Sequence, residues 1–236
     1  MKAFILAGGL GTRLRPLTFA IPKPLIPVGE RPILEILIEN LKAHGVEDIY
    51  LAVGYRAELI QVYFQDGRQF GVNIHYSQEE KRLGTAGPLR LIRDRFAIRE
   101  PALVMNSDII TEVSFRDFYQ SHLKKSAALT VGVRRYEYVV PYGVVEMEEG
   151  QIHSIEERPT LSFHINCGMY VVNPDILDLV PENQFFDMPD LIRAVMKAGH
   201  RVSAYPIRER LVTIESLGDL TEETNRSASG GTATSQ

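Results

Sequence analysis

Cysteine, tryptophan and long apolar runs are scarce in this sequence. Cys167 is the only cysteine among 236 residues, so the chain can form no internal disulfide and has no cysteine cluster for structural zinc. A lone thiol is typical of a reducing compartment, which predicts a cytoplasmic protein. No apolar run reaches the roughly 18 residues that a membrane helix needs, and the apolar stretch 3–7 is too short for a signal peptide. We therefore expect no membrane partner.

Charge of one sign is not in large excess either. The chain has 26 Lys and Arg against 30 Asp and Glu, a net charge of −4. Such a balance does not favour binding to nucleic acid or to an anionic membrane. The hydrophobic share of 44% is enough for a real core. These figures indicate one large α/β domain or two small ones and exclude a peptide, a fibre or a disordered chain.

Short apolar strands alternate with longer segments of helical period through the first half of the chain. This alternation of strand and helix predicts a doubly wound, mostly parallel, Rossmann-like α/β sheet. The expected strands are 2–7, 49–53, 72–76, 102–105 and 127–133, and the expected helices are 32–43, 57–70, 85–95 and 114–125.

The pattern changes after residue 135. Residues 142–147 and 151–155 flank a Glu-Glu-Gly turn and predict a β-hairpin, an insertion that could cover a substrate. Further expected elements are a strand at 168–172, a helix at 187–197, a strand at 201–206 and a short helix at 217–224. Residues 227–236 are rich in Ser, Thr and Gly and predict a disordered tail.

The clearest motif opens the chain, directly after the first strand. Residues 6–18 read Leu-Ala-Gly-Gly-Leu-Gly-Thr-Arg-Leu-Arg-Pro-Leu-Thr, and Pro-Lys-Pro follows at 22–24. Gly8, Gly9 and Gly11 let the backbone approach an oxyanion closely, and the arginine and lysine of these segments add positive charge. The motif therefore predicts a site for a polyphosphate.

Two better-known phosphate loops do not fit the spacing. A Walker A loop needs Lys-Ser or Lys-Thr directly after its last glycine, and a dinucleotide fingerprint needs a glycine where Leu14 stands. Residues 1–31 hold five basic side chains and a single acid, Glu30, so this segment is positive in a negative chain. The simpler alternative is a tight turn with solvated basic side chains.

The motif of residues 6–18 and 22–24 resembles the signature of the sugar-1-phosphate nucleotidyltransferases, and the similarity runs to about residue 225. The segments 84–87 and 186–191 look most like those of guanylyltransferases that activate sugars for the biosynthesis of surface polysaccharides or nonulosonic acids. The resemblance implies one nucleotidyltransferase domain, 1–226, with a nucleotide-binding part at about 1–135 and a sugar-binding part at about 136–226. It also implies GTP and a sugar 1-phosphate as substrates, and a homo-oligomer.

The resemblance assigns roles to the charged residues. Arg13 would act on the triphosphate and Lys23 would bridge the α-phosphate and the sugar phosphate, the two being catalytic together with Asp108. A sugar 1-phosphate is already an anionic nucleophile, so the reaction needs alignment and charge neutralisation rather than a general base. Asp108 follows an apolar strand and is the expected Mg²⁺ ligand, although a strand-end aspartate can also cap a helix.

Further segments that resemble those of the family supply the expected contacts to the nucleotide and the sugar. Glu79 could accept hydrogen bonds from guanine and Gly84 would allow the base to approach the backbone, although a polar loop with a cap at Thr85 is an equal alternative for Glu79. The expected nucleotide-binding residues are Leu6, Ala7, Gly8, Gly9, Gly11, Thr12, Arg13, Glu79 and Gly84. The expected sugar-binding residues are Gly143, Glu157, Arg158 and Asn166.

The sequence departs from the family pattern near its end. Thr213 stands where the family commonly has a second metal-binding aspartate, and a hydroxyl is a poor Mg²⁺ ligand. Glu215 or Asp219 could replace it, and the two-residue period of a strand favours Glu215. Cys167 has no evident base partner and is expected to be a packed thiol rather than a nucleophile.

Two other functions remain open from the sequence. A catalytically weak relative that binds a nucleotide-sugar and regulates a partner would explain Thr213, but it leaves the charges of Arg13, Lys23 and Asp108 without a task. A glycosyltransferase of similar topology would need an Asp-x-Asp motif, and residues 106–108 read Asn-Ser-Asp. The sequence does not decide which sugar 1-phosphate is used, which base is read with certainty, or the oligomeric state.

Overall fold

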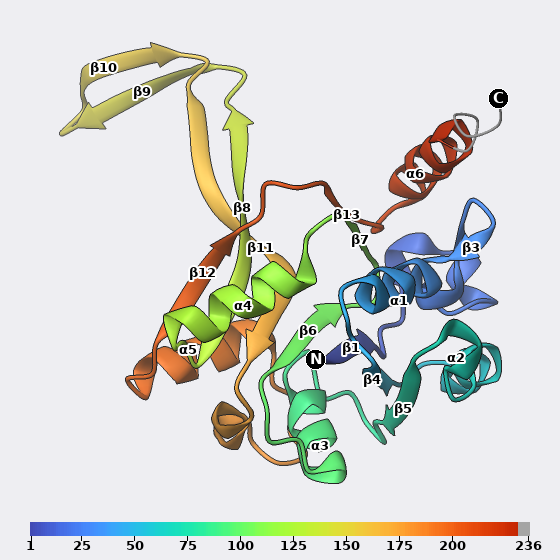
Figure 1. The fold of residues 1–236 in the computed structure, drawn as a ribbon. Helices are drawn as coiled ribbons and strands as arrows, with labels where there is room; N and C mark the ends of the chain where they lie inside the picture. The colour runs from blue at the N-terminus through green and yellow to red at the C-terminus, as the bar shows by residue number, and fades with distance from the viewer. Residues whose placement is uncertain (231–236) are drawn as a thin grey trace.

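A seven-stranded sheet forms the centre of the molecule (Figure 1), and the computed structural model describes residues 1–230. Its strands lie in the order β12-β8-β11-β6-β1-β4-β5. All neighbouring strands are parallel except β11, which is antiparallel to both neighbours. The predicted mostly parallel α/β sheet is therefore confirmed. The strands are β1 (Lys2–Ala7), β4 (Asp48–Val53), β5 (Asn73–Gln78), β6 (Ala102–Asn106), β8 (Leu129–Val139), β11 (Thr160–Val172) and β12 (Val202–Pro206).

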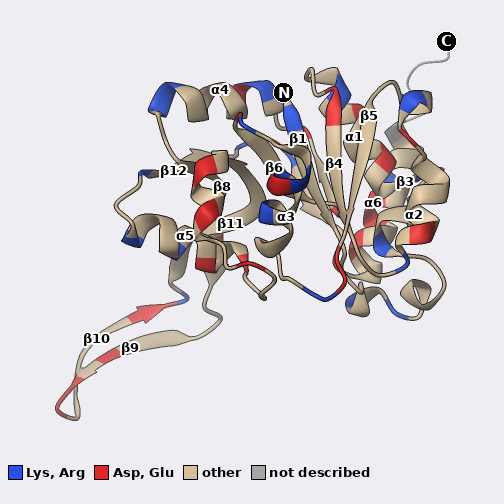
Figure 2. Cartoon of the chain, turned by 90° about the horizontal axis from the view of Figure 1, so that it is seen from below, with Lys and Arg blue, Asp and Glu red and all other residues tan. Residues whose placement is uncertain are grey.

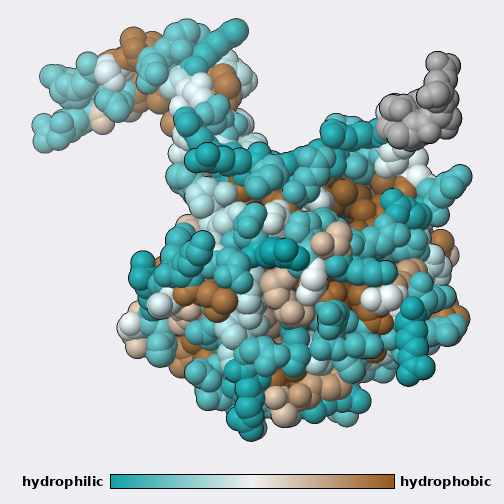
Figure 3. All heavy atoms as spheres, viewed as in Figure 1, coloured by the Kyte–Doolittle hydropathy of each residue, from teal (hydrophilic) through white to brown (hydrophobic). Residues whose placement is uncertain are grey.

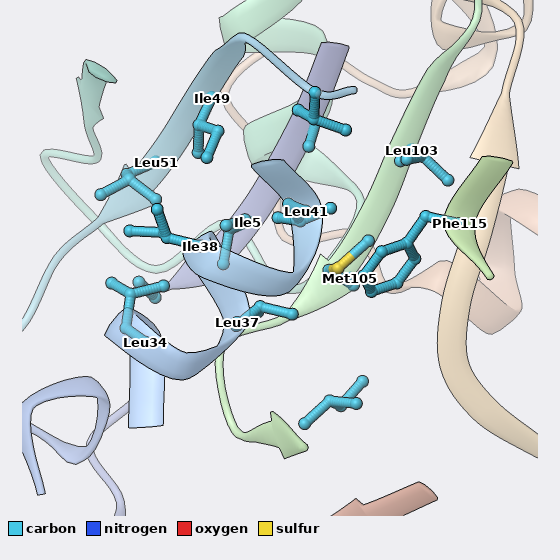
Figure 4. Packing of buried hydrophobic residues seen from close by; sticks show 14 of the residues in the cluster. Ile5, Leu34, Leu37, Ile38, Leu41, Ile49, Leu51, Leu103, Met105 and Phe115 are labelled. Atoms are coloured by element: carbon cyan, nitrogen blue, oxygen red, sulfur yellow. The ribbon is translucent and has the colours of Figure 1, made fainter. Parts of the chain in front are cut away.

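Helices cover both faces of this sheet, because successive side chains of a strand point to opposite sides. On β1, Ala3 and Ile5 pack with α1, α2 and α4, whereas Phe4 packs with α3 and α5. Figure 4 shows the first of these layers, with Leu37 of α1 and Phe115 of α4. The helices are α1 (Ile33–Ala43), α2 (Ala57–Phe64), α3 (Gly87–Phe96), α4 (Phe115–Lys125), α5 (Met188–Lys197) and α6 (Leu217–Gly230).

Local chemistry explains where two of the helices begin or end. The Ser114 hydroxyl accepts a hydrogen bond from the Asp117 amide at 3.2 Å and so caps α4. α2 ends at Phe64, short of the expected residue 70, because Gln65 has φ 47° and cannot continue a helix. The chain turns and forms a 3₁₀ turn at Arg68–Phe70 instead.

Several short elements lie outside the sequence-based expectation. They are too brief to show a period, and two of the strands, β7 and β13, pair with each other across about a hundred residues. The short strands are β2 (Pro27–Val28), β3 (Arg31–Pro32), β7 (Ile109–Thr111) and β13 (Leu211–Thr213), and the other 3₁₀ turns are Thr12–Leu14, Leu17–Phe19, Lys23–Leu25 and Pro174–Leu179.

An arm of residues 134–166 projects from one edge of the molecule (Figures 1 and 3). It consists of the outer halves of β8 and β11 and of the hairpin β9 (Gly143–Glu148) and β10 (Gln151–Glu157). The predicted hairpin is thus confirmed, and β8 and β11 run far beyond their predicted bounds. Almost every residue of the arm is exposed, and the hairpin extends away from the body rather than over it.

The last helix, α6, is longer than expected. It continues to Gly230, so residues 227–230 of the predicted disordered tail are helical, and 231–236 lie outside the described residues. The helix is held by Glu223, a buried carboxylate that pairs with Arg210. Within residues 1–230, no helix is long and apolar enough to cross a membrane.

Candidate active site

A cavity of about 480 Å³ lies at the carboxyl ends of the parallel strands β1, β5 and β6. This is the edge where open α/β sheets bind their ligands, and the volume is that of a small-molecule site. Its wall includes every residue that the sequence assigned to catalysis, nucleotide binding or metal binding. These residues are Leu6, Ala7, Gly8, Gly9, Gly11, Thr12, Arg13, Lys23, Glu79, Gly84, Asp108 and Glu215.

The three glycines of the first loop serve different structural needs. A Cβ on Gly8 would lie 2.8 Å from Glu79 Oε1, so a side chain there would collide with the opposite wall. Gly11 has φ 60°, and a Cβ there would lie 2.7 Å from Thr18 Cγ2. Gly9 is exposed, and a Cβ there would meet nothing within 4 Å. Gly8 and Gly11 therefore shape the loop, whereas Gly9 leaves its backbone open to the cavity.

Two ion pairs cross the cavity. Arg13 pairs with Glu215, and Lys23 pairs with Asp108. The side chains of Lys23 and Asp108 are only 17% and 15% exposed, so their charges are poorly screened by water. Asp108 Oδ1 is buried and has no hydrogen-bond partner among the described residues. A buried carboxylate oxygen without a partner is costly unless a ligand binds it.

The strands β7 and β13 bring the end of the chain to Asp108. Thr213 pairs with Ile109, and the Ile214 amide donates to the Asp108 carbonyl at 3.0 Å. Glu215 reaches the cavity wall and Thr213 does not. This placement agrees with the preference for Glu215, although its metal role stays a prediction.

Asp219, the other residue considered for this place, has a structural task. Its Oδ2 accepts hydrogen bonds from the amides of Glu215 and Ser216 at 3.0 and 2.7 Å, beside the start of α6. Burial opposes ionisation of Asp219, but these hydrogen bonds outweigh it and lower the pKa of the carboxyl. Asp219 is therefore already occupied as a cap.

Glu79 and Gly84 form the wall opposite the glycine-rich loop. Glu79 Oε2 accepts a hydrogen bond from the Leu83 amide at 2.8 Å, and burial raises the pKa of Glu79 despite this bond. Gly84 has φ 79°, and a Cβ there would lie 2.6 Å from the Phe186 carbonyl oxygen. A side chain at position 84 is therefore excluded by both conformation and space.

The segments 84–87 and 186–191, which resembled those of guanylyltransferases, are bound to each other. Asp187 Oδ1 accepts from the Thr85 amide at 2.9 Å and from its hydroxyl at 3.1 Å, and the Met188 amide donates to that hydroxyl at 2.7 Å. The amide of Ala86 donates to the Phe186 carbonyl at 2.9 Å. These bonds fix the loop that carries Gly84.

A match to a family model identifies the group to which this chain is related. The model is described as Nucleotidyl transferase and covers residues 2–210. The chain belongs to the nucleotidyl transferase family. A mannose-1-phosphate guanyltransferase from Schizosaccharomyces pombe is 43% identical over 187 residues, which are 76% of this chain and 52% of that protein.

Another curated relative is named as an enzyme that uses a different nucleotide. A UTP–glucose-1-phosphate uridylyltransferase from Synechocystis sp. is 36% identical over 217 residues, which are 84% of this chain and 56% of that protein. The chain thus spans about half the length of these curated relatives. A structure of HddC from Yersinia pseudotuberculosis, complexed with GMP-PN, has the same fold, with a TM-score of 0.75 and 24% identity over 96% of this chain and 99% of that one.

The expected sugar-binding residues lie outside the cavity wall. Gly143 pairs with Glu157 at the root of the β9–β10 hairpin, and Arg158 follows directly. Asn166 lies at the base of the arm, where its Oδ1 accepts from the Gly168 amide at 2.9 Å. The structure therefore brings the first three together on the arm but does not bring them to the nucleotide loop, and their roles stay predictions.

Some residues of the cavity wall were not assigned by the sequence analysis. They include Arg82, Asn106, Ser107, Phe185 and Asp187. Asn106 and Ser107 directly precede Asp108 after an apolar strand, and that position was a usable signal. Asp187 belongs to the segment 186–191, which the resemblance had singled out without giving the residue a role, whereas Phe185 directly precedes that segment.

Cys167 agrees with its predicted structural role. It is buried in the core beneath the arm, and burial raises the pKa of its thiol. A thiol with a raised pKa is a weak nucleophile at neutral pH.

Proposed function

We propose that this chain transfers a nucleoside monophosphate, GMP, from a nucleoside triphosphate to a sugar 1-phosphate. A phosphate oxygen of the sugar attacks the α-phosphorus, the bond from the α-phosphorus to the bridging oxygen breaks, and pyrophosphate leaves with that electron pair. The observation that carries the proposal is one cavity that joins a glycine-rich phosphate loop to the Lys23–Asp108 pair.

The cations of the cavity suit this reaction. Arg13 is on the loop that also carries Gly9, where it can neutralise the triphosphate and the leaving pyrophosphate. Lys23 lies deeper, beside Asp108, where its positive charge can neutralise a transferred phosphate. Alignment and neutralisation of two anions are what this transfer requires, because its nucleophile needs no deprotonation.

The donor set fits Mg²⁺. Asp108 offers a buried carboxylate oxygen without a protein partner, and Glu215 offers a second carboxylate in the same wall. Mg²⁺ is commonly held by one or two carboxylates together with substrate phosphates. When bound, the ion supplies positive charge to the phosphates.

Glu79 supports guanine as the base. An ionised carboxylate accepts hydrogen bonds from guanine N1–H and N2–H₂, and uracil and thymine have no such pair of donors. Glu79 lies on the wall with Gly84 and beside the glycine-rich loop. The curated guanyltransferase relative gives the same preference.

The sugar 1-phosphate completes the proposal. Gly143, Glu157, Arg158 and Asn166 are proposed to contact it, with the arm as the carrier of the first three. The free thiol at Cys167 suits a reducing compartment, so we place the reaction in the cytoplasm.

A regulatory relative that binds a nucleotide-sugar is the second candidate function. The observation that favours it is Thr213, which leaves Asp108 without the aspartate that the family commonly supplies. Glu215 in the cavity wall weakens this argument, because a second carboxylate is present after all.

Release of pyrophosphate separates the two functions. The full chain would be assayed with Mg²⁺, each of GTP, dTTP, UTP, CTP and ATP, and a panel of hexose, hexosamine and heptose 1-phosphates. Release with GTP and one class of sugar is the expected result. No release from a protein that still binds a nucleotide would overturn the enzyme and favour the regulatory candidate.

A further inference from the structure

The turn that follows β4 lies against the glycine-rich loop. β1 and β4 are parallel neighbours whose last residues are paired, and Figure 2 shows the two strands side by side. The residues after these strands also stay close, since a Cβ on Gly54 would lie 3.2 Å from the Gly8 carbonyl oxygen. Tyr55 and Arg56 complete this turn before α2, and neither lines the cavity. Any effect of these two side chains on a ligand must therefore pass through the loop.

Both side chains bind the backbone at the far end of the glycine-rich motif. The Tyr55 hydroxyl donates to the Thr18 carbonyl at 3.2 Å, and the Arg56 guanidinium donates to the Phe19 carbonyl at 2.6 Å. Arg56 Nε also donates to the Tyr55 hydroxyl at 3.0 Å. The hydroxyl oxygen thus accepts from a cation while its own proton points at Thr18, and the two side chains act as one unit.

Arg56 has an uncommon backbone conformation for a residue with a side chain. Its φ of 52° and ψ of 39° lie in the left-handed region, which glycine adopts freely and other residues adopt with strain. Strained residues of this kind cluster at functional sites. The guanidinium at position 56 therefore has a task that glycine could not perform, and the two hydrogen bonds of Arg56 show what it holds.

Thr18 carries this restraint to the part of the loop that lines the cavity. Thr18 is buried, and its hydroxyl donates to the Gly11 carbonyl at 2.9 Å. The same carbonyl accepts from the Leu14 amide at 3.0 Å. The C=O and the following N–H of a trans peptide point to opposite sides, so these bonds turn the Thr12 amide away from Thr18. Thr12 lines the cavity, where its amide can donate to a phosphate oxygen.

We propose that Tyr55 and Arg56 are positioning residues for the nucleoside triphosphate. They hold Thr18, Thr18 fixes the peptide between Gly11 and Thr12, and this peptide presents its N–H to a phosphate oxygen. The inference rests on the proposed nucleotidyl transfer, because it concerns the phosphate loop of that reaction. Binding of GTP tests it separately from turnover.

The first comparison removes one hydroxyl near the loop and one far from it. Tyr55→Phe loses the bond to Thr18, and the control Tyr119→Phe loses a bond of the same kind, to the Pro101 carbonyl at 3.1 Å, outside the cavity wall. Each variant should melt about 2–4 °C below the wild type, because each loses one hydrogen bond of the fold. Titration calorimetry with GTP and Mg²⁺ measures Kd. Tyr55→Phe should raise Kd about tenfold, as loss of a hydrogen bond to a charged group does, and Tyr119→Phe should leave it unchanged.

The second comparison removes the guanidinium without disturbing the turn. Glycine adopts the conformation of Arg56 freely, so Arg56→Gly is expected to fold. Gln65→Gly is the matched control, because Gln65 ends the same helix with φ 47° and lies outside the cavity wall. Arg56→Gly should raise the Kd for GTP several-fold, whereas Gln65→Gly should keep the wild-type value.

A double variant shows whether Tyr55 acts through Thr18. Thr18→Val keeps the shape of the side chain and loses the hydroxyl, and it should raise the Kd for GTP about tenfold. Thr18→Ser keeps the hydroxyl and should bind GTP nearly as the wild type does. Tyr55→Phe combined with Thr18→Val should be no weaker than Thr18→Val alone, because the two changes break the same connection. In the transfer assay, KM for GTP should rise and KM for the sugar 1-phosphate should stay unchanged.

Two results would overturn the positioning role. They are equal Kd values for Tyr55→Phe and Tyr119→Phe, and effects of Tyr55→Phe and Thr18→Val that multiply in the double variant. A wild type that binds GTP but releases no pyrophosphate would overturn the proposed function alone, and the Kd comparisons would still decide the role of Tyr55. A wild type that binds no GTP would overturn both.

Discussion

Replacing Gly9 by alanine adds one methyl group to the loop that faces the nucleotide cavity. In the free protein this methyl group would meet no atom within 4 Å, so nothing in the fold opposes it. Gly9 lines the cavity, however, and the added carbon would take the room through which a polyphosphate approaches the backbone. The variant therefore separates an effect on ligand binding from an effect on folding stability.

The variant should be more stable than the wild type but less active. Alanine restricts the unfolded chain, so the free energy of unfolding should rise by about 0.4–1 kcal/mol. For a protein of this size that is a rise of about 1–4 °C in melting temperature. Loss of a close backbone contact to a phosphate should lower kcat/KM by at least about 100-fold, or about 2.7 kcal/mol of transition-state binding.

Two measurements on Gly9→Ala test this reasoning. Thermal denaturation follows stability, and pyrophosphate release follows kcat/KM for the triphosphate. Gly218→Ala is the matched control, because Gly218 is an exposed residue of α6 outside the cavity wall. It should keep full activity. A Gly9→Ala variant with kcat/KM close to that of the wild type would refute the close approach.

Three other predictions concern single side chains. Glu79→Gln should raise KM for GTP. In the wild type, KM for GTP should rise at acidic pH, because protonation of Glu79 at its raised pKa removes an acceptor for guanine. The variant should not show this rise, and an equal pH profile in both proteins would contradict the role of Glu79. Thr213→Asp adds a carboxylate opposite Ile109, the residue that follows Asp108, and should lower the Mg²⁺ concentration for half-maximal activity several-fold; an unchanged titration would remove Thr213 from the metal site. Burial lowers the pKa of His122, despite its hydrogen bond with Asn173, so the unfolded chain takes up a proton at higher pH than the folded one. The free energy of unfolding should therefore fall as the pH drops below about 6.5, by up to about 1.4 kcal/mol per pH unit until the lowered pKa is reached; denaturant titrations should show this slope, and His122→Gln should lack it.

The strands of the sheet and the helices that cover it were predictable, because each shows its hydrophobic pattern within its own sequence. The apolar stripe of α1, for example, faces the core as its period indicates, with Leu34, Leu37 and Leu41 buried. The short strands β7 and β13 pair residues about a hundred positions apart, and a three-residue strand has no period to detect. Such elements depend on tertiary contacts alone.

The residues of the candidate site were likewise predictable only in part. The glycine-rich loop was visible because its spacing is specific, and the cavity contains it together with Lys23 and Asp108. The segment of Asp187 was singled out, but its role was not, because its bonds to Thr85 link segments far apart in the chain. The exposed apolar face that Tyr136, Tyr138, Leu161 and Phe163 form on the arm was not predicted either. The hairpin between β8 and β11 separates its two strands in the sequence. The face becomes evident only from the register.

Transfer of a labelled α-phosphate tests the central claim most directly. The full chain is incubated with Mg²⁺, a sugar 1-phosphate and GTP that carries ³²P at the α-position, and the products are separated. We predict that the label moves into a nucleotide-sugar only when the sugar 1-phosphate is present. Label that stays in GTP, or that appears as GMP whether or not the sugar 1-phosphate is added, would contradict nucleotidyl transfer by this cavity.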